Sequence, residues 1–203
     1  MKLFSSGYGL IKDSIFIIRN VLCSIKMPEF QRIEFDKLTI EPCRKEYLEE
    51  IFSLYKDLHD GTDLSRRNKL LLHLTGHNFC YIVRSGNEIV GLGLYYFNKK
   101  DIKENTIHVG YTGLKKEYRG KGIGTIARKN ALYHFSQVKS IMGVSSRVDL
   151  DNEASYRGNV KLGFKVKEQY LDTDSNKDRV YLVCDLKEYK RTLKEYEGRW
   201  EAQ

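Results

Sequence analysis

Residues 115–135 read KKEYRGKGIGTIARKNALYHF. Three glycines fall within five residues of this stretch: Gly120, Gly122 and Gly124. Glycines let a backbone approach an anion closely, and the N-terminus of the apolar helix expected after them adds partial positive charge. Arg119 and Lys121 add full charges at the rim. The stretch predicts a turn that seats a diphosphate; the alternative is a surface turn whose glycines only relieve crowding.

Two other phosphate-binding motifs do not match this stretch. A P-loop requires GxxxxGK[ST], but no glycine stands five residues before Gly120, and Gly122 rather than Ser or Thr follows Lys121. The glycine spacing is GxGxG, so the GxGxxG pattern of dinucleotide-binding folds is absent as well.

A second motif, DNEASYRGNVKLGF, occupies residues 151–164, about 30 residues downstream. It consists of an asparagine, a short expected helix and a Leu-Gly-Phe ending. The pattern Arg119-x-x-Gly122-x-Gly124 followed by this motif resembles the acetyl-CoA signatures of the GNAT N-acetyltransferase superfamily. The likeness covers roughly residues 37–186. Two motifs in the right order, with strands between them, are more specific than either one.

The resemblance implies that acetyl-CoA binds where the family's fourth and fifth strands splay apart. Backbone groups from Thr112 to Leu114 would pair with the pantetheine arm, and N–H groups from Arg119 to Thr125 would hold the diphosphate. A bulge in the fourth strand would polarise the thioester carbonyl, with the Leu114 N–H as the nearest donor. The expected cofactor-binding residues are Thr112, Leu114, Arg119, Gly120, Lys121, Gly122, Ile123, Gly124, Thr125, Asn152 and Asn159.

The resemblance also implies direct attack by a neutral amine on the thioester, without an acyl-enzyme. Many family members protonate the leaving thiolate with a tyrosine four residues before the glycine of Leu-Gly-Phe, where this chain has Asn159. Tyr156 shares a helical face with Asn152 and Asn159, so we take it as the candidate acid. Ser155 is the alternative acid. The other alternative is that Tyr156 has no catalytic role and only packs against the sheet.

His108 is the candidate base, because the ordinary pKa of histidine, about 6.5, suits proton transfer near neutral pH. The alternative bases are Glu104 and a chain of water molecules. The non-catalytic alternative is a His108 that faces solvent at a strand edge. His73, His77 and Cys80 have metal-ligand types at plausible spacing, but no fourth ligand stands out, so we expect no metal.

Composition and charge limit the partners. The 203 residues carry a net charge of +8, which favours an anionic partner. The basic residues are dispersed apart from Lys115 to Lys129, which the phosphates of CoA already explain, so we expect no nucleic acid. Four cysteines form no CxxC pair and predict free thiols in a reducing compartment, hence a cytoplasmic protein.

The expected fold is α/β (α+β), with a mixed, mostly antiparallel central sheet of about six to seven strands flanked by helices. As in the GNAT family, strands four and five should splay apart. We expect an N-terminal amphipathic helical extension at 1–36, an acetyl-CoA-binding N-acetyltransferase domain at 37–186, and a charged C-terminal helix or tail at 187–203.

The N-terminal helix carries an apolar face made by Ile11, Ile15, Ile18, Leu22 and Ile25. Such faces usually cover a core, so we expect this one to pack on the domain or on a second subunit, which would make a homodimer. The alternative is a helix resting on a membrane surface.

The expected activity is acetyl transfer from acetyl-CoA to a primary amine on a small molecule such as an amino sugar. Two alternatives stay open at this point. One is a protein amine as acceptor, and the other is a catalytically weak acyl-CoA-binding module of the same fold, suggested by the missing tyrosine at 159 and the lack of a carboxylate between Ile107 and Leu114.

Overall fold

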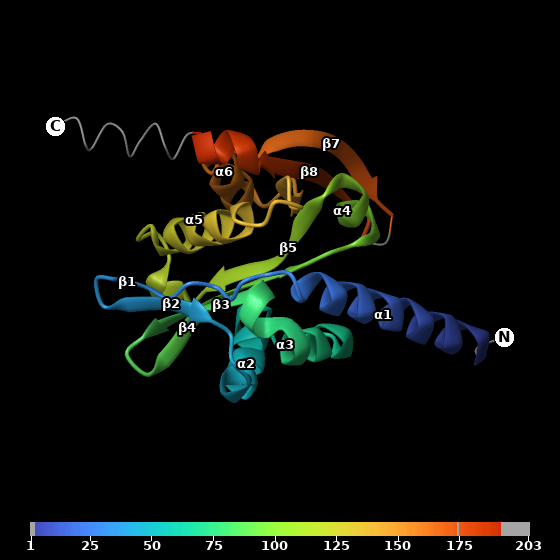
Figure 1. The fold of residues 1–203 in the computed structure, drawn as a ribbon, viewed down its shortest axis with the longest axis horizontal. Coiled ribbons are helices and arrows are strands. Elements are labelled where there is room, and N and C mark those ends of the chain that lie inside the picture. Colours follow the sequence, from blue (N-terminus) through green and yellow to red (C-terminus); the bar gives the residue numbers. More distant parts are fainter. Residues whose placement is uncertain (1–2, 174, 192–203) are drawn as a thin grey trace.

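The structure is a computed structural model that describes residues 3–173 and 175–191. Within these residues one sheet runs through the molecule in the strand order β1-β2-β3-β4-β5-β6-β8-β7 (Figure 1). The strands are β1 Ile33–Phe35, β2 Leu38–Pro42, β3 Cys80–Ser85, β4 Glu88–Tyr96, β5 Thr106–Leu114, β6 Gly143–Asp149, β7 Lys165–Asp172 and β8 Lys177–Asp185. The helices are α1 Leu3–Ser24, α2 Leu48–Leu58, α3 Arg66–Phe79, α4 Lys99–Glu104, α5 Ile123–Ser136 and α6 Glu153–Lys161, with single 3₁₀ turns η1 Lys45–Tyr47 and η2 Lys116–Tyr118.

The pairing confirms the expected mixed, mostly antiparallel sheet. Neighbouring strands run antiparallel except β5 and β6, which are parallel. The described residues hold eight strands instead of the six to seven expected. The extra one is β1, which pairs with β2 across a tight turn at Asp36. Three residues are too few to show an alternating pattern, so the sequence does not reveal this strand.

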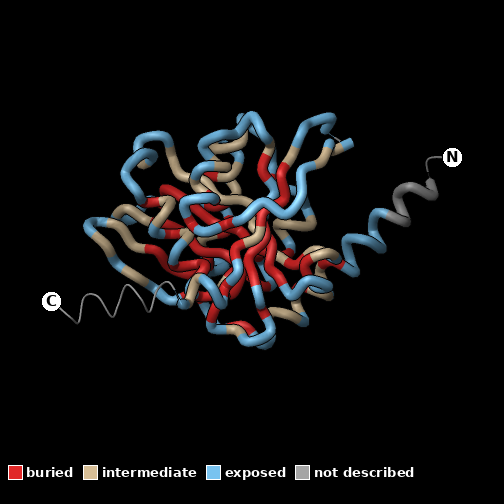
Figure 2. Tube along the Cα trace, turned by 90° about the horizontal axis from the view of Figure 1, so that it is seen from above, coloured by how far each residue is buried: buried red, intermediate tan, exposed pale blue. Residues whose placement is uncertain are grey.

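The two faces of the sheet are covered by different helices. In Figure 1, α2 and α3 lie on one side of the sheet, and α5 and α6 lie on the other. Side chains alternate accordingly along β3, where Tyr81 and Val83 join the core that includes α5, while Cys80 and Ile82 join the core under α2. The buried residues concentrate on the sheet between these layers (Figure 2).

The splay expected between strands four and five is present between β5 and β6, because the additional strand β1 shifts the strand numbers by one. The two strands pair only at Thr106↔Gly143, Ile107↔Val144 and His108↔Ser145, although β5 continues to Leu114. A bulge follows the last of these pairs, because Val109 and Tyr111 pair with consecutive residues of β4 and leave Gly110 extra. A Cβ at Gly110 would collide with the Tyr96 ring, so glycine is required there. The bulge lies four residues before Leu114, so the Leu114 N–H is not the donor nearest to it, contrary to what the sequence led us to expect.

Helix α1 packs on the domain with the opposite face from the one expected. Phe16 and Asn20 are buried, and the Asn20 amide bonds both backbone groups of Phe97, donating to the carbonyl at 3.1 Å and accepting from the N–H at 2.7 Å. The isoleucine face that we expected to pack on the domain is exposed instead. The sequence pattern predicted that the more apolar face would be buried. In the structure the buried face is instead the one that carries Asn20, whose amide pairs with the backbone of Phe97.

The expected domain boundaries stay a prediction, and two observations bear on the segments at either end. Strand β1 belongs to the sheet although it lies within the expected extension 1–36. Residues 186–191 are helical, and the rest of the expected C-terminal helix, 192–203, lies outside the described residues. None of the helices in the described ranges is long and apolar enough to cross a membrane.

Candidate functional site

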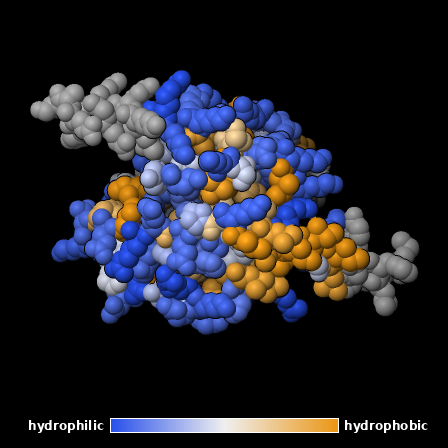
Figure 3. All heavy atoms as spheres, viewed as in Figure 1, coloured by the Kyte–Doolittle hydropathy of each residue, from blue (hydrophilic) through white to orange (hydrophobic). Residues whose placement is uncertain are grey.

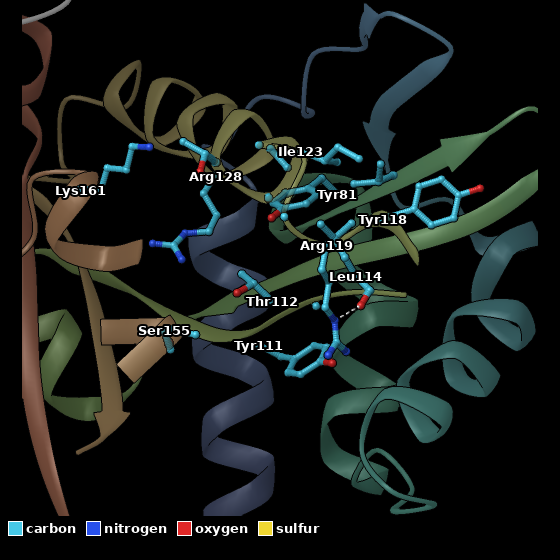
Figure 4. A pocket seen from close by; sticks show the side chains of 18 of the residues that line it. Tyr81, Tyr111, Thr112, Leu114, Tyr118, Arg119, Ile123, Arg128, Ser155 and Lys161 are labelled. Atoms are coloured by element: carbon cyan, nitrogen blue, oxygen red, sulfur yellow. Dashed lines mark hydrogen bonds between the residues drawn. The ribbon is translucent and has the colours of Figure 1, made fainter. Parts of the chain in front are cut away.

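A cavity of about 590 Å³ lies where β5 and β6 separate (Figure 4). Its walls are the last residues of β5, the glycine turn, the first turns of α5 and the start of α6, with Tyr81 and Val83 of β3 also lining it. Nine of the expected cofactor-binding residues line this cavity: Thr112, Leu114, Arg119, Gly120, Gly122, Ile123, Gly124, Thr125 and Asn152. The two sequence motifs thus meet around one opening.

The open edge of β5 offers backbone groups to this cavity. The Lys115 N–H donates to the Val90 carbonyl at 2.9 Å, so residue 115 and every second residue before it turn their peptide groups toward β4. The peptide groups of Thr112 and Leu114 therefore point to the opposite edge, where β6 has already diverged. The Leu114 carbonyl accepts from Arg119 Nε at 2.9 Å, which ties the glycine turn to the strand end.

The glycines of the turn are required by backbone conformation and not by crowding. Gly120 and Gly122 have φ of 76° and 78°, in the left-handed region that other residues rarely adopt. A Cβ at either position would have no atom within 4 Å, so crowding does not explain the glycines. Gly122 directly precedes α5, so the turn presents its N–H groups beside the positive end of that helix.

The outermost N–H groups of the expected diphosphate site already have acceptors. The Arg119 N–H donates to the Lys116 carbonyl at 3.1 Å, and the Thr125 N–H donates to the Gly122 carbonyl at 2.9 Å. The groups between them, from Gly120 to Gly124, include the first N–H groups of a helix, for which the helix itself has no carbonyl. The N–H groups that the turn could offer to a ligand therefore lie between Gly120 and Gly124.

Two cations that we did not single out in the sequence also line the cavity, Arg128 and Lys161. In Figure 4 both side chains lie on the α5 and α6 side of the opening. Arg128 Nη2 donates to Asn159 Oδ1 at 3.2 Å, and Gly158 leaves room for the guanidinium, because a Cβ there would lie 3.3 Å from Arg128 Nη1. The sequence could have predicted that Arg128 lies near the glycine turn, because it stands one helical turn after Gly124 on the same helix.

Two expected cofactor-binding residues are not among the described residues that line the cavity. Lys121 Nζ lies 5.7 Å from the Tyr118 ring centroid, over the face of that ring. Asn159 is buried, and its amide donates to the Ser155 carbonyl at 2.9 Å and accepts from Arg128. Asn159 therefore influences the cavity by orienting Arg128.

The candidate acids lie side by side on α6. Asn152 caps this helix, since its Oδ1 accepts from the Ser155 N–H at 3.0 Å. Ser155 lines the cavity. Tyr156 is half-buried and packs against the main core; it is not one of the described residues that line the cavity. Its role as the acid stays a prediction.

His108 is buried in a polar network at the closed end of the splay. The Ser145 hydroxyl donates to Asp101 Oδ1 at 2.6 Å, and the Thr106 hydroxyl donates to the same oxygen at 2.8 Å. His108 Nδ1 lies 2.8 Å from Ser145 Oγ and must donate, because the serine proton is already used. Burial lowers the pKa of His108 to about 4, so the ring is neutral near pH 7.

His108 does not face solvent, contrary to the strand-edge alternative, and it is not one of the described residues lining the cavity. Its role as the base stays a prediction. Glu104, the other candidate, accepts a hydrogen bond from the Tyr181 hydroxyl at 3.0 Å. Within the described ranges, no cluster of His, Cys, Asp and Glu side chains is arranged to hold a metal ion, and His73, His77 and Cys80 form none.

Comparison with known proteins gives one family. The model of the acetyltransferase (GNAT) family matches residues 41–164, more than half of the chain. No curated protein matches significantly. Among solved structures, NAA60 of Arabidopsis thaliana in complex with acetyl-CoA is 13% identical with a TM-score of 0.64, over 73% of this chain and 99% of that one.

Two bacterial structures are similar to the same degree. The ribosomal-protein-S5-alanine acetyltransferase of Vibrio fischeri is 16% identical with a TM-score of 0.63, over 78% of this chain and 98% of that one. The ribosomal-protein-S18-alanine N-acetyltransferase of Escherichia coli is 12% identical with a TM-score of 0.59, over 73% and 94%. At these identities the likeness establishes the fold.

Proposed function

Because the chain belongs to the GNAT acetyltransferase family, we propose that it transfers an acetyl group from acetyl-CoA to a primary amine by direct attack, without an acyl-enzyme. The acceptor is a small-molecule amine such as an amino sugar. The observation that carries the proposal is the cavity at the splay, where an unpaired strand edge meets a glycine turn at a helix N-terminus.

The residues around this cavity suit acetyl-CoA. The open edge at Thr112 and Leu114 would pair with the amide groups of the pantetheine arm, as a further strand would. The N–H groups from Gly120 to Gly124 would hold the diphosphate, with the positive end of α5 behind them. Arg128 and Lys161 would add two positive charges toward the phosphates.

The open edge also supplies donors for the thioester oxygen. Donors aimed at the developing oxyanion are a large contribution to acyl transfer. The Leu114 N–H is one donor that points to the cavity side. The Thr112 N–H points the same way and lies nearer to the bulge at Gly110, so we place it beside Leu114 as a candidate.

Proton transfers are assigned to α6 and to the interior of the splay. Tyr156 or its neighbour Ser155 would protonate the leaving thiolate from α6. His108 would accept the amine proton through a water, because its ring does not reach the cavity. Its neutral state near pH 7 leaves the Nε2 lone pair available, but a pKa of about 4 makes the ring a weaker base than the ordinary value of about 6.5 from which the sequence argument started.

The acceptor class is the least constrained part of the proposal. Protein amines are the alternative, and the solved relatives named for protein acetylation support only the shared fold at 12–16% identity. A catalytically weak acyl-CoA-binding module is the remaining alternative. A cytoplasmic location is supported by the free thiols of Cys23, Cys43, Cys80 and Cys184, which form no disulfide in the described part of the chain.

Two measurements on the full chain test the proposal. Acetyl-CoA and CoA should each raise the melting temperature, since a ligand that binds only the folded state stabilises it. Thiol release from acetyl-CoA should then rise above the hydrolytic background with at least one member of a panel of amino sugars, polyamines and peptides with free N-termini. No thermal shift with either nucleotide would refute acetyl-CoA binding, and a shift without thiol release over the whole panel would favour the binding module.

A further inference from the structure

Helix α1 exposes a continuous apolar stripe to solvent. Its members are half to three-quarters exposed: Ile11 59%, Ile15 50%, Ile18 58%, Leu22 61% and, directly after the helix, Ile25 74%. Leu10 extends the stripe on one side at 67%. The space-filling view shows apolar side chains gathered along α1 where it leaves the body of the molecule (Figure 3). Isolated exposed leucines need no explanation, but a contiguous stripe of this length marks an interaction surface.

The stripe lies on the side of α1 that faces away from the domain. Asn20 and Phe16 fix the inner side, and the Arg67 guanidinium of α3 stacks 4.3 Å from the Phe16 ring centroid and pairs with Asp13 at 3.4 Å. At about 100° per residue, Ile18 and Asn20 point to nearly opposite sides of the helix. A partner on the stripe therefore does not compete with the domain for α1.

Basic residues run along one edge of the stripe. Lys12 and Arg19 lie seven residues apart on α1, which keeps them on one line beside the isoleucines, and Lys26 follows seven residues later in the turn directly after the helix. In the sequence of α1 the only acidic residue is Asp13, and it turns toward Arg67. An occupant that offers both an apolar layer and negative charge would match this surface.

A second copy of the chain matches it poorly. An antiparallel pair of α1 helices would set the basic edge against itself. A parallel pair would set that edge against Ser14 and Val21, which carry no negative charge. Anionic lipids supply an apolar layer and a charged layer at the depths where the stripe and the basic edge would lie.

From this surface we infer that α1 is a membrane-interface helix that docks the protein on anionic lipid bilayers. The isoleucine stripe enters the boundary between headgroups and acyl chains, and Lys12, Arg19 and Lys26 contact the headgroups. The helix lies on the surface and does not cross it, since none of the described helices is apolar and long enough to span. This docking is independent of the proposed acetyl transfer, because the cavity lies between β5, α5 and α6.

Sedimentation with lipid vesicles tests the inference. The full chain should pellet with vesicles of phosphatidylcholine mixed with phosphatidylglycerol, and less with phosphatidylcholine alone or at high salt. Ile18→Glu combined with Leu22→Glu should weaken the partition at least about tenfold. The matched control is Leu171→Glu on β7, a similarly exposed leucine (54%) far from α1 in sequence, which should leave the partition unchanged.

The basic edge has its own pair of variants. Arg19→Glu with Lys26→Glu should weaken the partition on anionic vesicles by at least about fivefold per side chain. Lys103→Glu with Lys139→Glu gives the same change in net charge on exposed sites outside α1, and should have a much smaller effect. Equal effects of the two pairs would mean that net charge alone drives binding, which would overturn the inference.

Other outcomes also decide it. No pelleting of the wild type on anionic vesicles, or unchanged pelleting of the Ile18 and Leu22 variant, overturns the inference. A wild-type dimer in sedimentation equilibrium that the same variant dissociates also overturns the inference, because a second copy of the chain would then cover the stripe. Thermal unfolding with and without acetyl-CoA keeps the tests separate: vesicle binding stands or falls whether or not acetyl-CoA stabilises the protein.

Discussion

The two halves of β5 have the same strand geometry and opposite surroundings. Its first three residues pair with β6 and are buried, while the residues from Tyr111 to Leu114 pair with β4 alone and are partly exposed along the cavity. The bulge at Gly110 separates the halves. In the closed half, polar side chains bond one another; in the open half, the peptide groups of Thr112 and Leu114 have no strand partner on the cavity side.

This difference shows that polar groups of one strand can serve two purposes, internal hydrogen bonding in the closed half and contact with a ligand in the open half. Buried polar groups are costly unless paired, so the network of Asp101, Thr106, Ser145 and His108 must be complete for the fold to be stable. Unpaired peptide groups at a cavity wall are available to a ligand. Changes in the closed half should therefore alter folding, and changes near the open half should alter cofactor binding.

The largest expected effect is on the closed half. Asp101→Ala removes the acceptor of Thr106, Ser145 and the Asn98 N–H, and should lower the free energy of unfolding by about 4 kcal/mol in urea titrations. Asp178→Ala, an exposed carboxylate on β8, should change it by less than about 0.5 kcal/mol. Similar losses in both variants would show that the network does not stabilise the closed half.

The open half should respond through binding. Gly122→Asp places a carboxylate at a left-handed position before α5, where the diphosphate is proposed to sit, and should weaken CoA binding at least about a hundredfold in calorimetry, about 2.7 kcal/mol. Gly61→Asp is the matched control, since Gly61 has φ of 83° and open space around it but lies in the turn after α2. Unchanged affinity for Gly122→Asp would remove the diphosphate from this turn.

Protonation distinguishes the halves further. The folded-state pKa of His108 is lowered to about 4, below its unfolded value of about 6.5, so the unfolded chain binds more protons between these pH values. Stability from this group is present above pH 6.5 and is lost as pH falls toward 4. Between pH 7 and pH 5 the loss should be about 2 kcal/mol, and His108→Gln should remove it.

His134 provides the comparison for that measurement. Burial also lowers its pKa to about 4, so His134→Gln should remove a second, similar part of the acid sensitivity without touching β5. If the slope of unfolding free energy against pH is the same in wild type and His108→Gln, the ring is not kept neutral by the closed half.

The cations beside the open half should have a moderate effect. Arg128→Ala removes a guanidinium from the cavity wall and should weaken CoA binding about tenfold, about 1.4 kcal/mol. Arg157→Ala on α6 removes a guanidinium that pairs with Glu153 in solvent, and should leave affinity unchanged. Equal affinities for the two variants would place the phosphates elsewhere.

The sequence predicts the open half better than the closed half for a physical reason. The glycine turn and the Asn152 cap are local features, set by left-handed backbone and short-range hydrogen bonds, so their spacing is readable. The network around His108 joins residues from α4, β5 and β6, up to 44 positions apart, and no local pattern records it. For the same reason Asp101 was not singled out.

Faces of helices show the same limit. The periodicity of α1 identifies its apolar side but not whether that side meets the domain, because the contact that decides it joins Asn20 to Phe97, 77 positions away. On α6 the spacing placed Asn152, Tyr156 and Asn159 on one face, whereas the cavity is lined by Asn152, Ala154, Ser155 and Lys161. The cavity therefore contacts residues from more than one face of this short helix, and the spacing of a single face does not predict all of them.

The smallest expected effect concerns the proton for the leaving thiolate, where position and acidity disagree. Ser155 lines the cavity and Tyr156 does not, but a phenol is a much stronger acid than an alcohol. We expect Tyr156→Phe to lower kcat about fivefold with KM for acetyl-CoA unchanged, and Ser155→Ala to stay within about twofold. The effect is small compared with ordinary acid catalysis because a thiolate is a good leaving group even without protonation. The reverse order would assign the proton to Ser155, which lines the same cavity as the open half of β5.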